Sequence, residues 1–324
     1  MTSKKNGSVP SVSIIIRCFN EQKHIGKLLF GIKTQHFDGD VEVLVVDSGS
    51  TDDTVAIAGK HGAKIVSIAP EEFSFGRALN MGCAAASGEL LVFASAHVYP
   101  LYDDWLATLT KPFRSEKTAL CYGRQRGGDG TKFSEEQVFR QWFPETSTAV
   151  QETPFCNNAN CAIRRDLWKR FPYDEMLTGL EDIDWARRVQ KDGYHIAYSA
   201  EAAVAHIHEE SFRQTLNRYR REAIALKRID PEQNMTLWDY SSLLMKNILS
   251  DYVRAIRNGC LSENFVQIPA FRAAQLTGAL WGFRRGGTVS SALKRTFYYP
   301  RGVRPVRNPE RGDRRPIDYT GGFS

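Results

Sequence analysis

The protein has 324 residues, 42% of them hydrophobic, with six scattered cysteines and a formal net charge of +6. This composition is typical of a folded cytoplasmic protein with reduced thiols, and the length allows one large domain or a domain with a helical appendage. No apolar run reaches the roughly 20 residues of a membrane span, so we do not expect a membrane-spanning protein. No nucleic-acid-binding motif accompanies the basic residues, so we do not expect a nucleic-acid-binding protein.

Strand and helix patterns alternate in the first hundred residues. Four segments have the pattern of buried strands, namely 12–16, 41–46, 64–68 and 90–94. Helical patterns begin at Asn20 and at Gly76, and the segment after Asp47 supplies a turn and a helix cap. This alternation predicts an α/β fold with a mostly parallel, Rossmann-like sheet flanked by helices. Its ligand should lie beyond the carboxyl ends of the strands.

A carboxylate pair, Glu181 and Asp182, precedes a predicted helix around Trp185. We expect the pair in the exposed first turn of that helix, where a carboxylate can take the proton of an attacking hydroxyl group. Acidic residues are also common at this position because the helix dipole favours them. From the residues alone, both interpretations stay open.

Three histidines are candidate ligands for a divalent cation. His97 follows the fourth predicted strand, and His206 and His208 lie two residues apart, on one face of a strand. Imidazole suits Mn²⁺ and its neighbours better than the hard Mg²⁺ ion. The alternative is that these are ordinary interior histidines.

Four ordered motifs resemble those of family 2 glycosyltransferases with the GT-A fold. They are Arg17 to Glu21, Val45 to Asp52, Gly76 to Gly82, and the Glu181-Asp182 pair. The resemblance extends over residues 12–211, and within the family it is strongest to the bacterial rhamnosyltransferase-like group, which builds surface polysaccharides. It implies a GT-A domain over 1–211, with a nucleotide half of about 12–97 and an acceptor half of about 98–211.

The resemblance also implies an activity and a set of site residues. The enzyme would be an inverting transferase that moves a sugar from a UDP- or dTDP-sugar to a hydroxyl of a glycan or lipid-linked acceptor. Asp182 would be the general base, with Glu181 beside it. The implied donor-binding residues are Arg17, Asn20, Glu21, Asp47, Ser48, Arg77, Asn80, Ser95 and Ala96. The implied acceptor-side residues are Asn158, Asn160 and Trp185.

The chain departs from the family at the metal motif, because Ser95-Ala96-His97 stands in place of Asp-x-Asp. Related GT-A transferases that use Asp-x-His and a later histidine suggest His97 and His206 as ligands, with His208 as the substitute for His206. We therefore expect a divalent cofactor, Mn²⁺ rather than Mg²⁺. A metal-independent site, with Arg77 and basic residues neutralising the phosphates, is the alternative.

After Ser211 the resemblance fades. We expect a helical accessory region over 212–283, with helices at 212–226, 238–256 and 269–283, and a basic, partly disordered tail over 284–324. The tail predicts contact with an anionic membrane surface, on the inner face of the membrane, or with another copy in a homo-oligomer; a solvated tail is the alternative.

Two other functions compete with the transferase. A sugar-nucleotide-binding protein of GT-A fold with lost or weak turnover would explain the missing acidic motif. A sugar-1-phosphate nucleotidyltransferase shares a similar sheet, but it would want a glycine-rich basic loop after the first strand, and Arg17 to Glu21 is not one.

Overall fold

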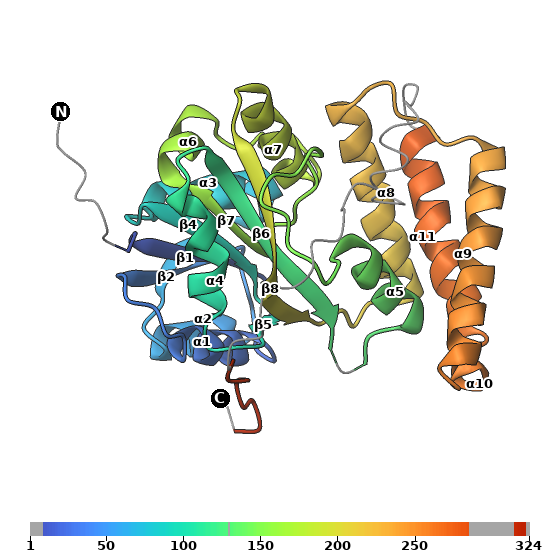
Figure 1. The fold of residues 1–324 in the computed structure, drawn as a ribbon, viewed down its shortest axis with the longest axis horizontal. Coiled ribbons are helices and arrows are strands. Elements are labelled where there is room, and N and C mark those ends of the chain that lie inside the picture. Colours follow the sequence, from blue (N-terminus) through green and yellow to red (C-terminus); the bar gives the residue numbers. More distant parts are fainter. Residues whose placement is uncertain (1–8, 129, 285–313, 322–324) are drawn as a thin grey trace.

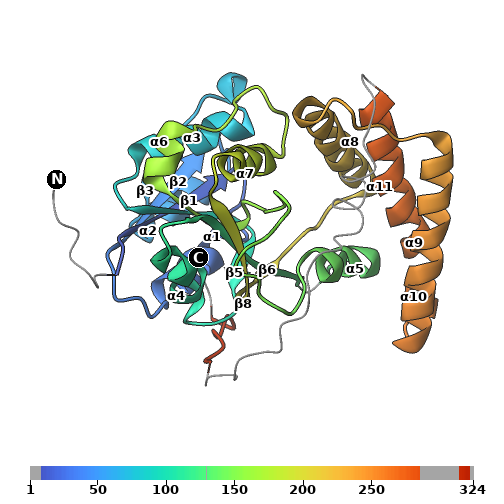
Figure 2. The same cartoon turned by 45° about the horizontal axis from the view of Figure 1, so that its top comes forward.

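A computed structural model describes residues 9–128, 130–284 and 314–321 of the chain. These residues form one sheet covered by helices on both faces, with a group of long helices standing beside it (Figure 1, Figure 2). The strands are β1 (Val12–Cys18), β2 (Val41–Asp47), β3 (Lys64–Ser67), β4 (Leu90–Ser95), β5 (Val98–Pro100), β6 (Thr118–Gly127), β7 (Asn160–Arg164) and β8 (His195–His206).

The sheet has the strand order β3-β2-β1-β4-β7-β6-β8-β5. The first four strands in this order are parallel to one another, as the alternation of strands and helices predicts. Strand β7 is antiparallel to β4 and β6, and β5 is antiparallel to β8, whereas β6 and β8 run parallel. The predicted α/β fold is confirmed, and its second half is a mixed sheet.

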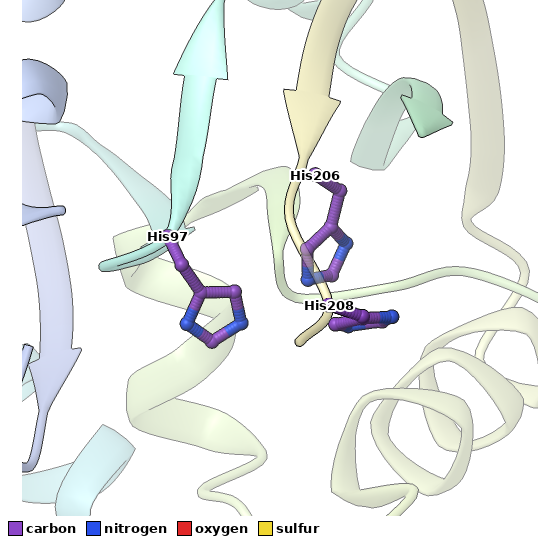
Figure 3. A group of neighbouring side chains, drawn as sticks. All are labelled: His97, His206 and His208. Atoms are coloured by element: carbon purple, nitrogen blue, oxygen red, sulfur yellow. The ribbon is translucent and has the colours of Figure 1, made fainter. Parts of the chain in front are cut away.

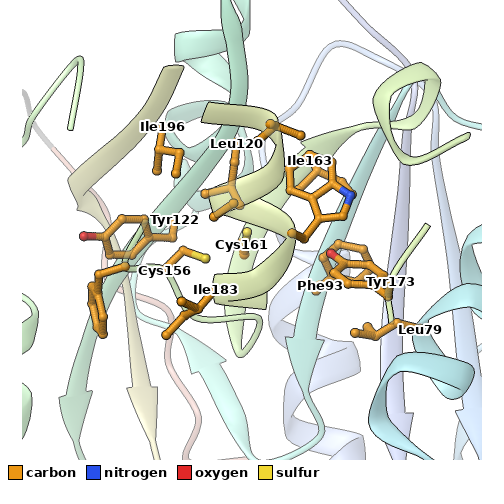
Figure 4. Packing of buried hydrophobic residues seen from close by; sticks show 14 of the residues in the cluster. Leu79, Phe93, Leu120, Tyr122, Cys156, Cys161, Ile163, Tyr173, Ile183 and Ile196 are labelled. Carbon is orange, nitrogen blue, oxygen red and sulfur yellow. The ribbon is translucent and has the colours of Figure 1, made fainter. Parts of the chain in front are cut away.

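Helices cover the two faces of the sheet. One face carries α1 (Ile25–Lys33), α2 (Thr54–Lys60) and α4 (Trp105–Thr110), and the other carries α3 (Phe75–Ala85), α6 (Arg165–Arg170) and α7 (Glu181–Lys191). In β1 the side chains alternate, so that Ile14 and Ile16 face the first layer while Ile15 faces the second. Figure 4 shows Leu79 of α3, Phe93 of β4 and Ile183 of α7 packed in that second layer.

The first helix begins later than the sequence pattern predicts. Residues 20–24 form a turn, and α1 begins at Ile25. Asn20 has a left-handed backbone, with φ 56°, and its Oδ1 accepts a hydrogen bond of 2.8 Å from the Thr51 backbone N–H. The turn at Asn20 orients its side chain toward Thr51, and this hydrogen bond connects the β1–α1 loop to the β2–α2 loop. Asn20 would not make the contact from within a helix.

The three long helices predicted after Ser211 are present as α8 (Phe212–Ile229), α9 (Leu237–Arg257) and α11 (Gln267–Arg284), with the short α10 (Leu261–Asn264) between the last two. Helix α11 lies between α8 and α9, and α5 (Phe133–Trp142) packs against the group from the sheet side (Figure 1, Figure 2). Buried residues of α8 and α11 belong to the same hydrophobic cluster as α3 and α7, so the division at Ser211 stays a prediction. Among the described residues, no helix is both long and apolar enough to cross a bilayer.

Part of the predicted tail is packed against the sheet domain. Arg284 ends α11, residues 285–313 lie outside the described residues, and residues 314–321 lie along β5 and α4. The Arg314 guanidinium binds the Asp104 carboxylate through two nitrogens, at 2.9 and 2.7 Å. The Ile317 backbone N–H donates to the Leu101 carbonyl at 3.1 Å. These contacts attach the segment to the sheet domain, although five of its eight residues are exposed. The basic, partly disordered tail over 284–324 stays a prediction.

Candidate active site

A pocket of about 650 Å³ opens where β1 and β4 end, between the β1–α1 loop, the start of α7, the end of β8 and one side of α8. It brings together predicted residues that are up to about 190 positions apart in the sequence. Those that line it are Arg17, Asn20, Glu21, Ser95, His97, Asn158, Glu181, Asp182, His206 and His208. The predicted base and the predicted metal ligands thus share one cavity.

The carboxylate of Asp182 is held from both sides by backbone donors. One oxygen accepts from the Asn158 N–H at 2.9 Å, and the other accepts from the N–H of its neighbour Ile183 at 2.9 Å. Only 7% of the residue is exposed, so the expected exposed first turn is wrong for this pair. Burial, and then the adjacent Glu181, raises the pKa of Asp182 to about 7. A carboxylate with this pKa can exchange a proton near neutral pH.

Glu181 faces Arg17 instead. Its Oε1 accepts from Arg17 Nη1 at 3.2 Å, and this ion pair links α7 to β1. The Arg17 guanidinium also lies over the Phe75 ring, 4.9 Å from its centroid. Leu180, with φ 58°, turns the chain just before the helix and so brings both carboxylates to the pocket wall.

The three histidines converge from two strand ends (Figure 3). His97 precedes β5, His206 ends β8 and His208 follows it. One ligand nitrogen of each ring lies within 4.8 Å of the others. From the sequence, His206 is the expected metal ligand and His208 a residue that could take its place, but both rings lie in the cluster.

The surroundings of this cluster fit a divalent cation. The Nδ1 atoms of His97, His206 and His208 contact Glu21 (2.8 Å), Gln125 (2.6 Å) and Glu135 (2.7 Å). Acidic or amide partners on one ring nitrogen are typical of metal-ligating histidines, because they orient the other nitrogen. The buried Nε2 of His206 has no hydrogen-bond partner among the described residues. Burial lowers the pKa of both His206 and His208 well below the usual range, which favours the neutral ring that a metal needs.

Several residues predicted to bind the donor lie outside the pocket lining. Asp47 accepts from the Gly49 and Ser50 N–H groups at 3.1 Å, as a capped turn does, and Ser48 donates to the Cys18 carbonyl. Arg77 pairs with Glu72 at the surface. Asn80 and Ala96 also lie outside the lining: the Asn80 amide bridges α3 to the Tyr173 backbone and to Trp168, and Ala96 is fully buried.

Two of the three acceptor-side residues are also structural. Trp185 is fully buried and donates to the Phe171 carbonyl, so it does not present a face on which a sugar can stack. Asn160 is fully buried and joins Trp105 to the Ala202 carbonyl. Asn158 lines the pocket, and its side-chain amide atoms are buried without a hydrogen-bond partner among the described residues.

Helix α8 supplies pocket residues that the sequence argument missed. Gln214, Arg218, Arg221 and Glu222 line the pocket at positions i, i+4, i+7 and i+8, which lie along one face of the helix. Arg218 contacts Glu135 at 2.6 Å and Glu210 at 2.9 Å, and Arg221 lies 4.6 Å from the Phe75 centroid. The amphipathic pattern of this segment was visible in the sequence, but its polar face carried no sign that it closes a site.

Comparisons with known proteins identify the family and the fold. Residues 13–171 match the family model described as glycosyl transferase family 2. The chain is 28% identical over 225 residues to the O-antigen chain rhamnosyltransferase WbaN of Salmonella anatum, a match that covers 65% of this chain and 70% of that protein.

Two solved structures share the fold. A mannosyltransferase of Pyrobaculum calidifontis, PcManGT, in complex with GDP-Man and Mn²⁺, aligns with a TM-score of 0.58 at 19% identity, over 84% of this chain and 87% of that one. Glucosyl-3-phosphoglycerate synthase of Mycobacterium tuberculosis, with Mn²⁺, UDP and glucosyl-3-phosphoglycerate, aligns with a TM-score of 0.52 at 25% identity, over 70% and 84% of the two chains. The chain is therefore a glycosyltransferase with the GT-A fold, and its residues 13–171 place it in glycosyl transferase family 2.

Proposed function

We propose that this enzyme transfers a sugar, with inversion, from a nucleoside-diphosphate-sugar to a hydroxyl of a glycan or lipid-linked acceptor, and that Asp182 is its general base. One observation carries the proposal: the Asp182 carboxylate and the three histidines open into the same pocket. A base and a site for the leaving diphosphate must lie on two sides of one reacting carbon, and a shared cavity meets that requirement.

The proposed step is a direct displacement. The acceptor oxygen forms a bond to the anomeric carbon while the bond from that carbon to the donor phosphate oxygen breaks, and its electrons leave with the nucleoside diphosphate. The proton of the acceptor hydroxyl passes to Asp182. The two backbone N–H groups hold the carboxylate in a fixed orientation, and the raised pKa matches the base to neutral pH.

His97, His206 and His208 are the residues that would hold a divalent cation. Such an ion, when bound, stabilises the negative charge that grows on the leaving diphosphate. A need for it is supported by the charge of the lining, which is unfavourable for an anionic donor. The lining holds seven acidic residues, Glu21, Asp52, Glu181, Asp182, Glu209, Glu210 and Glu222, against the four cations Arg17, Lys23, Arg218 and Arg221. Three imidazoles also favour Mn²⁺ or another transition-metal ion over Mg²⁺.

Substrate class is proposed from the relatives and from the lining. A polysaccharide or lipid-linked acceptor is supported by the similarity to an O-antigen chain rhamnosyltransferase, and the solved relatives were captured with GDP-Man and with UDP. For this chain we propose a UDP- or dTDP-sugar donor. Arg221 and Glu222 of α8 are proposed to contact the acceptor, because they line the same pocket as Asp182 and come from an element outside the predicted nucleotide half.

Replacing the proposed base tests the reaction type. Asp182→Asn should leave donor affinity nearly intact while lowering turnover by about 10²- to 10⁴-fold, since the acceptor keeps its proton. Donor affinity is measured by calorimetry with UDP- and dTDP-sugars, and turnover by release of the nucleoside diphosphate. Asp184→Asn, which changes a carboxylate of the same helix paired with Arg188, is the matched control. Full activity of the Asp182→Asn variant would remove Asp182 from this role, and donor binding without turnover in the native chain would favour a binding protein.

Replacing the histidines tests the cation site. His97→Ala and His206→Ala should each weaken Mn²⁺-dependent donor binding by at least about tenfold, because a ligand is lost. Mn²⁺ affinity is measured directly by calorimetry or by electron paramagnetic resonance on the protein without donor. His61→Ala, at the exposed end of α2, should leave the affinity unchanged. Equal Mn²⁺ affinity in all four proteins would favour the metal-independent alternative.

A further inference from the structure

Helix α9 is apolar on two opposite faces. Its inner face packs Tyr240, Leu243 and Leu244 against the protein core. Its outer face carries Trp238, which is 81% exposed, and Met245, Leu249 and Ile256, each more than half exposed. In Figure 1 and Figure 2 this helix is the outermost element of the helical group. A helix that is apolar on both sides is normally buried on both sides.

The outer side chains follow a coiled-coil repeat. Residues 238, 242, 245, 249, 252 and 256 are separated alternately by four and three positions over the whole helix. This spacing is the a and d pattern of a heptad, which places them in one narrow stripe. Ser242 and Tyr252 are the polar members of that stripe. Two other exposed apolar residues of α9 lie outside this repeat: Val253, 46% exposed, adjoins the stripe, and Leu237, 60% exposed, begins the helix. The a and d repeat itself is typical of a seam between two helices.

We propose that the outer stripe of α9 pairs in antiparallel orientation with the same stripe of a second copy of this chain. A two-fold axis through the stripe, at the level of residue 247 along the helix, would place Trp238 opposite Ile256, Ser242 opposite Tyr252, and Met245 opposite Leu249. In each pair the two positions are equally far from Asn247, at nine, five and two residues. The stripe is therefore complementary to itself, as an isologous interface requires.

The sizes of the paired side chains support this register. The largest exposed side chain, Trp238, meets an aliphatic one at each end of the interface, and the ring of Tyr252 meets the small Ser242. Tyr252 is already supported from its own chain by Phe265, whose ring is stacked 5.3 Å away, and Phe265 and Val266 extend the exposed apolar surface beyond the helix. Covering both stripes would bury on the order of 1,000 Å², the lower limit for a specific interface.

The oligomeric state of the full chain tests the pairing. Sedimentation velocity should give a mass of twice 36.6 kDa. Leu249→Glu should raise the dimer dissociation constant by at least about 30-fold, because it places a charge next to the two-fold axis. Val150→Glu, an equally exposed apolar residue outside α9, is the control and should stay dimeric. A monomeric native chain, or a dimer that Leu249→Glu does not weaken, would overturn the proposal.

Cysteine cross-linking tests the orientation. In a Cys260→Ser background, Ser242→Cys combined with Tyr252→Cys should give an intersubunit disulfide under mild oxidation, whereas Ser242→Cys alone should not. Cross-linking of the single variant alone would indicate a parallel pair and would contradict the antiparallel register. Vesicles of phosphatidylglycerol are a further probe: a chain that is monomeric and binds them in a Leu249-dependent manner would assign the stripe to a membrane instead.

Discussion

Asp182, the proposed general base, lowers the stability of the fold when it ionises. Burial raises its pKa to about 7, far above that of an aspartate in an unfolded chain. The folded protein therefore holds this proton more tightly than the unfolded chain does. The protonated Asp182 carboxyl group contributes fully to stability below its pKa in the unfolded chain, and this contribution is lost as the pH rises through its pKa in the folded protein. Ionising Asp182 therefore destabilises the fold. Active-site carboxylates with shifted pKa values commonly carry this kind of penalty.

This linkage predicts a pH-dependent difference in stability. Between about pH 4 and about pH 8 the free energy of unfolding of the native chain should fall relative to that of Asp182→Asn by on the order of 3 kcal/mol, because asparagine does not ionise. Urea denaturation at a series of pH values measures the difference. Turnover of the native chain should rise over the upper part of the same window. If the two proteins respond to pH in parallel, the raised pKa is not a property of Asp182.

At the level of elements, the sequence predicts well what local periodicity determines. The four strands of the first half and helices α3 and α7 lie within a few residues of their predicted bounds, because each has a regular apolar pattern. The start of α1 was missed, because Asn20 takes a left-handed backbone that depends on Thr51 in another loop. The same limit applies to the site: motif positions predicted the carboxylates and histidines, while α8 enters the pocket only through tertiary packing.

Three helices are joined by one buried polar cluster. Arg272 of α11 binds Asp251 of α9 at 2.8 Å and also donates to the backbone carbonyl of Ser134 in α5. The side-chain hydroxyl of Ser134 donates to Asp251 at 2.7 Å. Both charged side chains are almost fully buried. Removing one partner of such a pair leaves an uncompensated charge in a medium of low dielectric constant. This cluster should therefore fix the angle between the helical group and α5, the helix that carries Glu135 beside His208.

Asp251→Ala should lower the free energy of unfolding by about 3–5 kcal/mol, since it leaves the Arg272 guanidinium without a counter-charge. Chemical denaturation monitored by tryptophan fluorescence measures the loss. The double variant Asp251→Leu with Arg272→Met is the informative comparison, because it removes both charges and should recover most of the stability. If the double variant is as unstable as Asp251→Ala, the cluster stabilises the protein through the packing of its side chains and not through the pairing of their charges.

On the scale of the whole molecule, the end of the chain supports the strand that follows a proposed metal ligand. Tyr319 donates to the Pro100 carbonyl of β5 at 2.8 Å and lies 5.7 Å from the Tyr99 ring, measured between ring centroids. His97 immediately precedes this short strand. Tyr319 also lies against Gly31 of α1, where an added Cβ atom would clash with its hydroxyl oxygen. A glycine inside a helix is thus required by a residue almost 300 positions away.

That contact predicts that one substitution destabilises the native chain more than a Tyr319→Ala background. Glycine to alanine inside a helix normally stabilises by up to about 1 kcal/mol, but Gly31→Ala in the native chain should destabilise by about 1–3 kcal/mol, because the methyl group displaces Tyr319. In a Tyr319→Ala background, Gly31→Ala should be much less destabilising, because, of the close contacts of the added Cβ atom, only the one with Pro100 Cδ, at 3.3 Å, would remain. Thermal unfolding of the four proteins gives the coupling free energy, and Gly59→Ala in α2, whose added methyl meets no atom within 4 Å, should have the same effect in both backgrounds. Equal effects of Gly31→Ala with and without Tyr319 would show that the C-terminal segment is not docked at this position. Strand β5 would then be held by β8 and α1 without that segment.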